Sequence, residues 1–358
     1  MENLEKLRSW LSGTDYDGVI LARRDNFKWI TKENANAVCT NTEAGVAYLV
    51  IRKDGQIDLV ADSSDCPRME KEQNTLGARA ILVPWYEGMD AFFAAYCEDG
   101  KYASDTGIAG TVNVQTELIN VRMQLSGYEL ERYREIGQEC AKIVEQTAMD
   151  AKPGQTEEEV ANLLKARCIE KGISPDCVLV GSDERILDYR HPVPTDKKIE
   201  KSLLVVLGGE KYGLNISITR IVYFDEVPAE IKERMAQTQK VFAAMQLVMK
   251  DGMSYQEYFA KVQEIYAQCG YPEEWKMHHQ GGPTGYGCRE FVVTPDCKLI
   301  LKKNQAYAWN PTIQGTKCEE TTYLGEQGLE IFTKTDNWPR REVETPYGTC
   351  SVAEILRK

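Results

Sequence analysis

The fold of this chain is decided by a stretch that occurs twice, first as Lys152-Pro153-Gly154-Gln155-Thr156-Glu157-Glu158-Glu159 and again as Lys250-Asp251-Gly252-Met253-Ser254-Tyr255-Gln256-Glu257. Each copy has a basic residue and a Gly turn, then a Thr or Ser N-cap followed three residues later by Glu, which is the capping-box pattern that begins a helix. Both helices are expected to end at Gly after the same number of residues, at Lys171-Gly172 and Cys269-Gly270. One match of this kind would mean little, but two in register predict a duplicated α/β half with pseudo-twofold symmetry.

The sequence around the repeat predicts two domains, as expected for 358 residues, which is more than one hydrophobic core comfortably serves. A β-rich run follows each repeated helix, at Leu203–Leu207 and Ala306–Trp309. A smaller α/β pattern precedes the repeat, with a helix and three strands expected at Leu4–Leu11, Asp17–Ala22, Gly45–Ile51 and Ile81–Trp85. The long helix expected at Glu129–Ala151 marks a change of character near residue 125. We therefore predict an α/β (α+β) fold with a small N-terminal domain at residues 1–125 and a duplicated domain at residues 126–358.

The composition narrows the class of protein and its partners. A net charge of -12 argues against binding of nucleic acid, whose phosphates require a basic surface. Apolar runs are too short to span a bilayer, and the charged start Met1–Lys6 is unlike a signal peptide. The 11 cysteines form no Cys-x-x-Cys pair and no dense framework, so they are expected to be reduced. We expect a cytoplasmic protein that acts on a small molecule, with neither a nucleic acid nor a membrane as partner.

The sequence contains three histidines, and all of them lie in segments punctuated by Gly and Pro. His278 and His279 are adjacent and precede Gln280-Gly281-Gly282-Pro283, while His191 stands directly before a proline. Imidazole is the side chain best suited to proton transfer at neutral pH, and loops carry a large share of functional residues. The three histidines are therefore candidates for a catalytic site.

Five short motifs resemble, in their order and spacing, the motifs of one known family. They are Asn26-Phe27-Lys28-Trp29-Ile30-Thr31 for N-x-x-Y-L-T, Ile218-Thr219-Arg220 for D-I-T-R, His279-Gln280-Gly281-Gly282 for H-G-x-G, Asn310-Pro311 for E-P-G and Cys318-Glu319-Glu320-Thr321 for I-E-D-T. On these motifs the chain resembles the creatinase/aminopeptidase P/prolidase superfamily, peptidase family M24, over nearly its whole length. The resemblance implies a creatinase-like N-terminal domain, a pita-bread catalytic domain and a homodimer.

The residues at the metal-ligand positions depart from the family's pattern. The resemblance implies two divalent ions held by two Asp, one His and two Glu. Neutral residues stand at three of these positions, namely Val206 or Gly208, Ser217 and Asn310. Ligand side chains remain at His279 and Glu319, whereas such sites need about three protein ligands, and paired ions need bridging carboxylates. We therefore expect a divergent member of the family that holds no metal ion and no other cofactor.

Creatinase has this fold and hydrolyses a C–N bond without metal, so the resemblance implies catalytic roles for His191, Glu319 and His279. A histidine near a carboxylate has its charged form stabilised, so His191 is expected to activate water and to protonate the leaving nitrogen. Glu319 is expected to orient the substrate or to share the proton. The candidate substrate-binding residues are Tyr286, Asn310, Arg220, Arg289, His278 and Ser217.

Several of these candidates have a structural alternative. Arg220 is as well suited to an internal ion pair in this acid-rich chain as to a substrate carboxylate, and Arg289-Glu290 is suited to an ion pair within a loop. Tyr286 is suited to the core. His278 is expected to turn away from the pocket, because adjacent loop residues seldom share a target.

Three functions remain open. The leading interpretation is a metal-independent, creatinase-like hydrolase of a C–N bond in a small amino-acid-like, amide or amidino substrate. The first alternative is a metal-dependent Xaa-Pro aminopeptidase or dipeptidase. The second alternative is a non-catalytic binding protein with the M24 fold, against which the presence of all three histidines argues.

Overall fold

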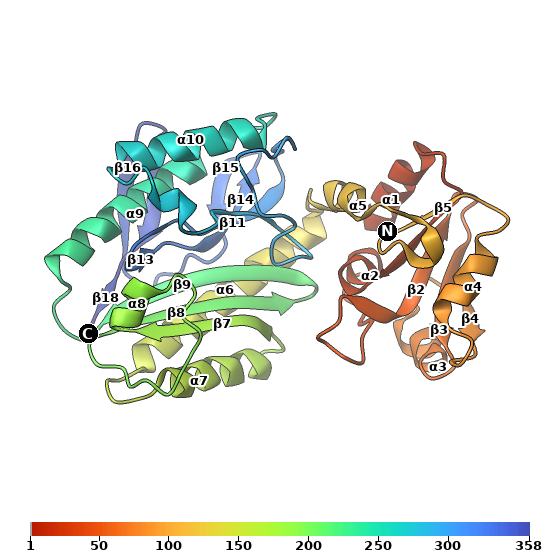
Figure 1. The fold of residues 1–358 in the computed structure, drawn as a ribbon, viewed down its shortest axis with the longest axis horizontal. Coiled ribbons are helices and arrows are strands. Elements are labelled where there is room, and N and C mark those ends of the chain that lie inside the picture. Colours follow the sequence, from red (N-terminus) through yellow and green to blue (C-terminus); the bar gives the residue numbers. More distant parts are fainter. Residues whose placement is uncertain (1) are drawn as a thin grey trace. The chain divides into compact units, whose positions relative to one another are not determined.

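The computed structural model describes residues 2–358, which form two compact units that divide after Ser126 (Figure 1). We call them the N-terminal unit, residues 2–126, and the C-terminal unit, residues 127–358. Both units combine helices with β-sheets, so the predicted α/β class is confirmed. Within residues 2–358 we find no helix whose length and apolar character would let it cross a lipid bilayer.

The N-terminal unit is built on a six-stranded sheet with the strand order β4-β3-β2-β1-β5-β6. Its strands are β1 (Gly18–Arg23), β2 (Ala44–Arg52), β3 (Ile57–Asp62), β4 (Arg79–Val83), β5 (Tyr102–Ser104) and β6 (Val112–Asn113). Its α-helices are α1 (Glu2–Ser12), α2 (Arg24–Thr31), α3 (Cys66–Arg68), α4 (Met89–Tyr96) and α5 (Gln115–Arg122). The strand predicted at residues 81–85 corresponds to β4, which ends earlier because Pro84 has no N–H for the ladder. Trp85 therefore lies outside the strand and is exposed.

The C-terminal unit contains two four-stranded sheets, with the orders β18-β9-β8-β7 and β10-β11-β14-β15, and two short hairpins, β12-β13 and β16-β17. Its α-helices are α6 (Gly127–Asp150), α7 (Glu157–Glu170), α8 (Glu184–Asp188), α9 (Ala229–Val248) and α10 (Tyr255–Gln268). The strands of the first half are β7 (Ser174–Ser182), β8 (Ser202–Lys211) and β9 (Leu214–Tyr223). The remaining strands are β10 (Gly281–Thr284), β11 (Gln305–Trp309), β12 (Thr312–Ile313), β13 (Thr316–Lys317), β14 (Glu320–Gly325), β15 (Gly328–Ile331), β16 (Arg340–Thr345), β17 (Gly348–Ala353) and β18 (Leu356–Arg357). Helices α6 and α7 pack on the first sheet, and Figure 1 shows α7 and α10 on opposite sides of this unit.

The repeated helices begin in the same way in both halves. Helices α7 and α10 each contain 14 residues, and each has a hydroxyl N-cap. The hydroxyl oxygen of Thr156 accepts a hydrogen bond from the N–H of Glu159, whose carboxylate accepts one from the N–H of Thr156. The hydroxyl oxygen of Ser254 accepts the corresponding bond from the N–H of Glu257. The predicted capping box is therefore confirmed at α7, and the hydroxyl N-cap is confirmed at α10.

The chain also enters the two helices through equivalent backbone contacts. The N–H of Gly154 donates to the carbonyl oxygen of Ile199 at 2.8 Å, and the N–H of Gly252 donates to that of Leu301 at 2.9 Å. Both glycines have positive φ, +90° and +83°, which an L side chain rarely adopts. The same turn and the same pairing therefore occur twice, which confirms the duplicated α/β architecture predicted from the sequence.

The two sheets of the C-terminal unit meet where β9 runs beside the segment leading into β14. The N–H of Thr219 donates to the carbonyl oxygen of Glu319 at 3.2 Å. Two residues earlier, the N–H of Ser217 donates to Oγ1 of Thr321 at 2.8 Å, and that hydroxyl donates back to the carbonyl oxygen of Ser217 at 3.0 Å. Side chains at alternate positions of a strand share one face, so Ser217 and Thr219 lie on the same face of β9. The junction brings residues of both halves together.

Candidate active site

A cavity of about 130 Å³ lies in the C-terminal unit and is lined by residues from both halves. Its lining includes six residues that the sequence analysis singled out, namely His191, Ser217, His279, Arg289, Asn310 and Glu319. Sites for drug-sized ligands occupy roughly 300–1,000 Å³. The size of this cavity therefore suits a small molecule.

Glu319 is the charged centre of this cavity. Its side chain is 4% exposed, and its carboxylate accepts a hydrogen bond from the hydroxyl of Thr219 at 2.6 Å. The ammonium group of Lys317 lies 3.0 Å from one carboxylate oxygen, and Nη2 of Arg289 lies 3.1 Å from the other. Burial by itself raises the pKa of this carboxyl, but the charges of Lys317 and Arg289 and the hydrogen bonds outweigh it and lower the pKa to about 2. Glu319 therefore stays ionised and does not fit the expected role in sharing a proton.

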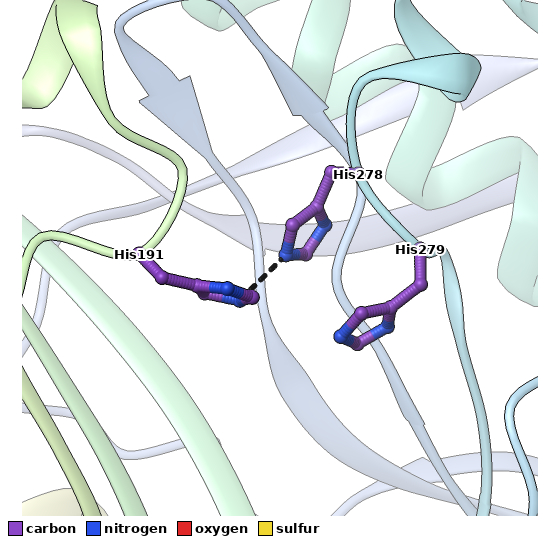
Figure 2. A group of neighbouring side chains, drawn as sticks. All are labelled: His191, His278 and His279. Atoms are coloured by element: carbon purple, nitrogen blue, oxygen red, sulfur yellow. Dashed lines mark hydrogen bonds between the residues drawn. The ribbon is translucent and has the colours of Figure 1, made fainter.

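The three histidines form one cluster (Figure 2), of which His191 and His279 line the cavity and His278 contacts His191 from outside the lining. Nε2 of His278 lies 2.9 Å from Nε2 of His191, close enough for a hydrogen bond in which one ring donates. The rings of His278 and His279 stack, with centroids 4.5 Å apart, and those of His191 and His279 lie 5.9 Å apart. One ring nitrogen from each residue lies within 4.8 Å of the other two.

His278 lies outside the cavity lining, but it does not turn away from the other histidines. Its imidazole points toward His191, which comes from the loop after α8 (Figure 2). Stacking of the two neighbouring rings at an interplanar angle of 23° lets His278 and His279 face the same side. His278 is also 7% exposed, whereas His191 and His279 are exposed. It is the buried member of the cluster.

The surroundings keep the imidazoles uncharged at neutral pH. Desolvation lowers the pKa of His191, and lowers that of His278 to about 2 and that of His279 to about 4. The positive charge of Lys317 lowers these pKa values further and outweighs the opposite effect of Glu319. The sequence analysis expected the carboxylate to stabilise a charged histidine. This expectation is wrong because two cations already pair with that carboxylate.

Arg220 and Tyr286 lie away from the lining of the cavity. The guanidinium of Arg220 is buried and pairs with Glu145 at 2.9 Å and with Glu320 at 3.1 Å. The hydroxyl of Tyr286 donates to a carboxylate oxygen of Glu129 at 2.9 Å, and the ring is buried. Arg220 therefore forms an internal ion pair and Tyr286 belongs to the core, which are the structural alternatives named above, and neither residue is part of the candidate site.

Arg289, Ser217 and Asn310 do lie at the cavity. Nη1 of Arg289 donates to Oγ of Ser217 at 2.8 Å, while Nη2 contacts Glu319. Nε of Arg289 and Oδ1 of Asn310 are buried and have no hydrogen-bond partner within residues 2–358. Buried polar atoms are nearly always paired, so an unpaired donor and an unpaired acceptor at one cavity indicate groups that a ligand satisfies.

Lys317 and Thr219 are site residues that the sequence analysis missed. Both side chains contact the carboxylate of Glu319. Thr219 follows Ser217 by two residues in β9, so alternation along the strand places both on one face, whereas Lys317 ends β13 and Glu319 lies in the link to β14. Period two was the available signal, although it does not tell which face is buried.

The residues present do not fit the paired-metal centre that the family implies. At the five ligand positions, side chains able to ligate a dication are those of His279 and Glu319, while Ser217 and Asn310 are neutral. The Glu319 carboxylate is already neutralised by Lys317 and Arg289. Two bridged dications require several carboxylates, so this ligand set does not support them.

The comparisons with known proteins place the chain beside peptidases. A sequence model of metallopeptidase family M24 matches residues 131–332, and no curated protein matches the chain. A prolidase from Pyrococcus horikoshii OT3 is 19% identical, with 94% of this chain and 99% of that chain covered and a TM-score of 0.78. An Xaa-Pro dipeptidase from Bacillus anthracis is also 19% identical, with 100% and 99% covered and a TM-score of 0.78.

The same fold also occurs in a protein whose description does not name a peptidase. The N-terminal domain of the FACT complex subunit SPT16 from Cicer arietinum is 11% identical, with 93% of this chain and 96% of that chain covered and a TM-score of 0.70. At such identities the likeness shows the fold, which confirms the pita-bread expectation. The matched family is one of metallopeptidases, so it favours the metal-dependent alternative over the metal-independent interpretation.

Removal of the buried cation of Arg220 tests its structural role. Arg220→Met leaves the carboxylates of Glu145 and Glu320 without this partner in the core, so we expect the free energy of unfolding to fall by about 3–5 kcal/mol. Urea denaturation of the whole chain measures this change. Arg341→Met is the matched control, because its ion pair with Glu354 is exposed and should contribute less than about 1 kcal/mol. Equal stabilities of the two variants would contradict the structural role.

Proposed function

The chain belongs to metallopeptidase family M24, and on that premise we propose that it hydrolyses a C–N bond of a small, carboxylate-bearing, amino-acid-like substrate without the family's pair of metal ions. The observation that carries the proposal is the clustering of three imidazoles, two of which line a small cavity that also holds two cations and one buried carboxylate. Family membership supports a hydrolase, and the ligand set argues against the paired ions.

The charges of the cavity favour an anionic substrate. Lys317 and Arg289 carry two positive charges against the single negative charge of Glu319. A substrate carboxylate would complete this balance, and Nε of Arg289 is a buried donor without a partner within residues 2–358. Oδ1 of Asn310 is an equally unpaired acceptor, which suits the N–H of an amide or amidine group.

The imidazoles are the groups that act on the attacking water. In hydrolysis, an O–H bond of water breaks as its oxygen bonds to carbon, the C–N bond breaks, and the proton ends on the leaving nitrogen. His191 and His279 are the exposed members of the cluster, so water and substrate reach them first. Glu319 is a positioning residue in this scheme, because its oxygens hold Lys317 and Arg289 in place.

A metal-dependent Xaa-Pro aminopeptidase or dipeptidase is the second candidate. The match to a family of metallopeptidases favours it, and two of the similar structures are a prolidase and an Xaa-Pro dipeptidase. In its usual form it needs the paired ions that the ligand set does not fit. Two divalent ions per chain in elemental analysis, together with turnover of Xaa-Pro dipeptides, would establish this candidate in place of ours.

Loss of one imidazole is expected to abolish most of the activity. A panel of dipeptides, N-acyl amino acids and guanidino acids, assayed for released amine, identifies the substrate. With that substrate, His191→Ala should lower kcat by about 10²–10⁴-fold, the range that a proton-handling group contributes. Tyr189→Phe is the matched control in the same loop, because Tyr189 is exposed and lies outside the cavity lining. Unchanged turnover by His191→Ala would refute the catalytic role.

The carboxylate preference is tested at Arg289. Loss of a charge-assisted hydrogen bond costs about 1.5–3 kcal/mol, which corresponds to roughly 10–100-fold in affinity. Arg289→Gln should therefore raise KM by that factor for carboxylate substrates and leave KM unchanged for their carboxamide analogues. The carboxamide series serves as the control for any general distortion of the cavity. An equal rise of KM in both series would contradict recognition of the carboxylate by Arg289.

We also propose that the protein works as a cytoplasmic homodimer. All 11 cysteines are free thiols, which suits a reducing compartment, and the family resemblance implies a dimer. Size-exclusion chromatography with light scattering is expected to give twice the chain mass of 40.5 kDa. A mass of one chain at micromolar concentration would contradict the dimer.

A further inference from the structure

The histidine cluster has the geometry of a set of metal ligands. Tetrahedral sites for zinc-like ions have metal–nitrogen distances of about 2.0–2.1 Å, which separates neighbouring ligand nitrogens by about 3.4 Å. The two Nε2 atoms of His278 and His191 are 2.9 Å apart, and the three ligand nitrogens lie within 4.8 Å of one another (Figure 2). Shifts on the order of 1 Å would therefore complete the arrangement.

The burial of the three rings is compatible with such shifts. His278 is 7% exposed, whereas His191 and His279 are exposed and lie in loops. Nδ1 of His278 is buried without a hydrogen-bond partner within residues 2–358, and its Nε2 faces another histidine. Buried polar atoms nearly always have a hydrogen-bond partner. The unpaired Nδ1 of His278, and its Nε2 beside another imidazole, therefore indicate a place where a ligand binds.

We propose that His191, His278 and His279 together bind one divalent transition-metal ion such as Zn²⁺ or Co²⁺. Imidazole nitrogen is a preferred ligand of these ions, and three protein ligands with one open position form a catalytic type of site. This ligand set differs from the carboxylate-rich pair of the family, since it takes His191 and His278 in place of the missing acids. One such ion would reconcile membership of a metallopeptidase family with a chain that does not fit the paired centre.

The charges around the cluster favour binding of an anionic substrate together with the ion. The ion adds positive charge to a cavity in which Lys317 and Arg289 already exceed Glu319 by one charge. The carboxylate of the substrate, bound at Arg289, would offset this charge and leave the open position for water. The inference thus rests on the proposed function and deepens it, because the imidazoles would hold an ion that would supply Lewis-acid activation of the water in place of acting on the water themselves.

The experiment measures ion binding without any substrate. The full chain is stripped with a chelator and titrated with Co²⁺ alone, followed by visible absorption and calorimetry. We expect one Co²⁺ per chain with the intense absorption of a four-coordinate site. His191→Ala is the main variant, because the exposed ring can be removed without disturbing the core. It should raise the Kd for Co²⁺ by at least about 100-fold. His278→Ala and His279→Ala should do the same, with folding checked by circular dichroism.

The cysteines supply the matched control. Cys177 and Cys288 also line the cavity, and their thiols are other side chains there that bind Co²⁺ well. If the histidines hold the ion, the double variant Cys177→Ser/Cys288→Ser should bind Co²⁺ as tightly as the native chain. Absence of binding, unchanged binding by His191→Ala, or two ions lost together in Glu319→Gln would each overturn the inference. A chain that binds the ion but hydrolyses no substrate would overturn the proposed function alone. A chain that hydrolyses substrate but binds no ion would overturn this inference alone.

Discussion

The buried carboxylate of Glu319 and the two cations beside it set the character of the whole cavity. An ionised group costs several kcal/mol to remove from water, and it is stable inside a protein only when partners surround it. Lys317, Arg289 and Thr219 are those partners, and they come from both halves of the C-terminal unit. The pairing therefore links β9, the segment leading into β14 and the loop after β10 in one arrangement. Loss of Lys317 or Arg289 would weaken this stabilisation of the buried carboxylate.

The same pairing separates this cavity from a metal centre rich in carboxylates. Where four carboxylates share a pocket, dications balance their charge. Here a guanidinium and an ammonium balance the one carboxylate that remains, and Ser217 accepts a hydrogen bond from Arg289 at a position where the family pattern implies Asp. Neutral side chains at three ligand positions and two cations beside Glu319 both lower the negative charge of the cavity. They leave the imidazoles as the side chains of this cavity best able to bind a transition-metal ion.

Fold and activity are separate matters in this family of structures. Proteins described as prolidases and a domain of a FACT complex subunit share the architecture at 11–19% identity. A shared fold therefore does not decide the reaction, which depends on the side chains at the site. In this chain the match to metallopeptidases and the lack of a fitting paired centre agree if the histidine cluster, rather than the carboxylate positions, holds an ion.

The sequence alone determined the duplicated α/β fold and six of the residues that line the cavity. Caps, Gly turns and strand alternation are local patterns, so the repeat at residues 152–159 and 250–257 was visible without coordinates. Tertiary structure decided the rest, because His191 and His278 are 87 positions apart and meet at 2.9 Å in the folded chain. The burial of Arg220 and the pairing of Arg289 with Glu319 likewise depend on which distant segments of the chain pack together. Charge balance in a cavity is a sum over such distant groups, and sequence order does not record their distances.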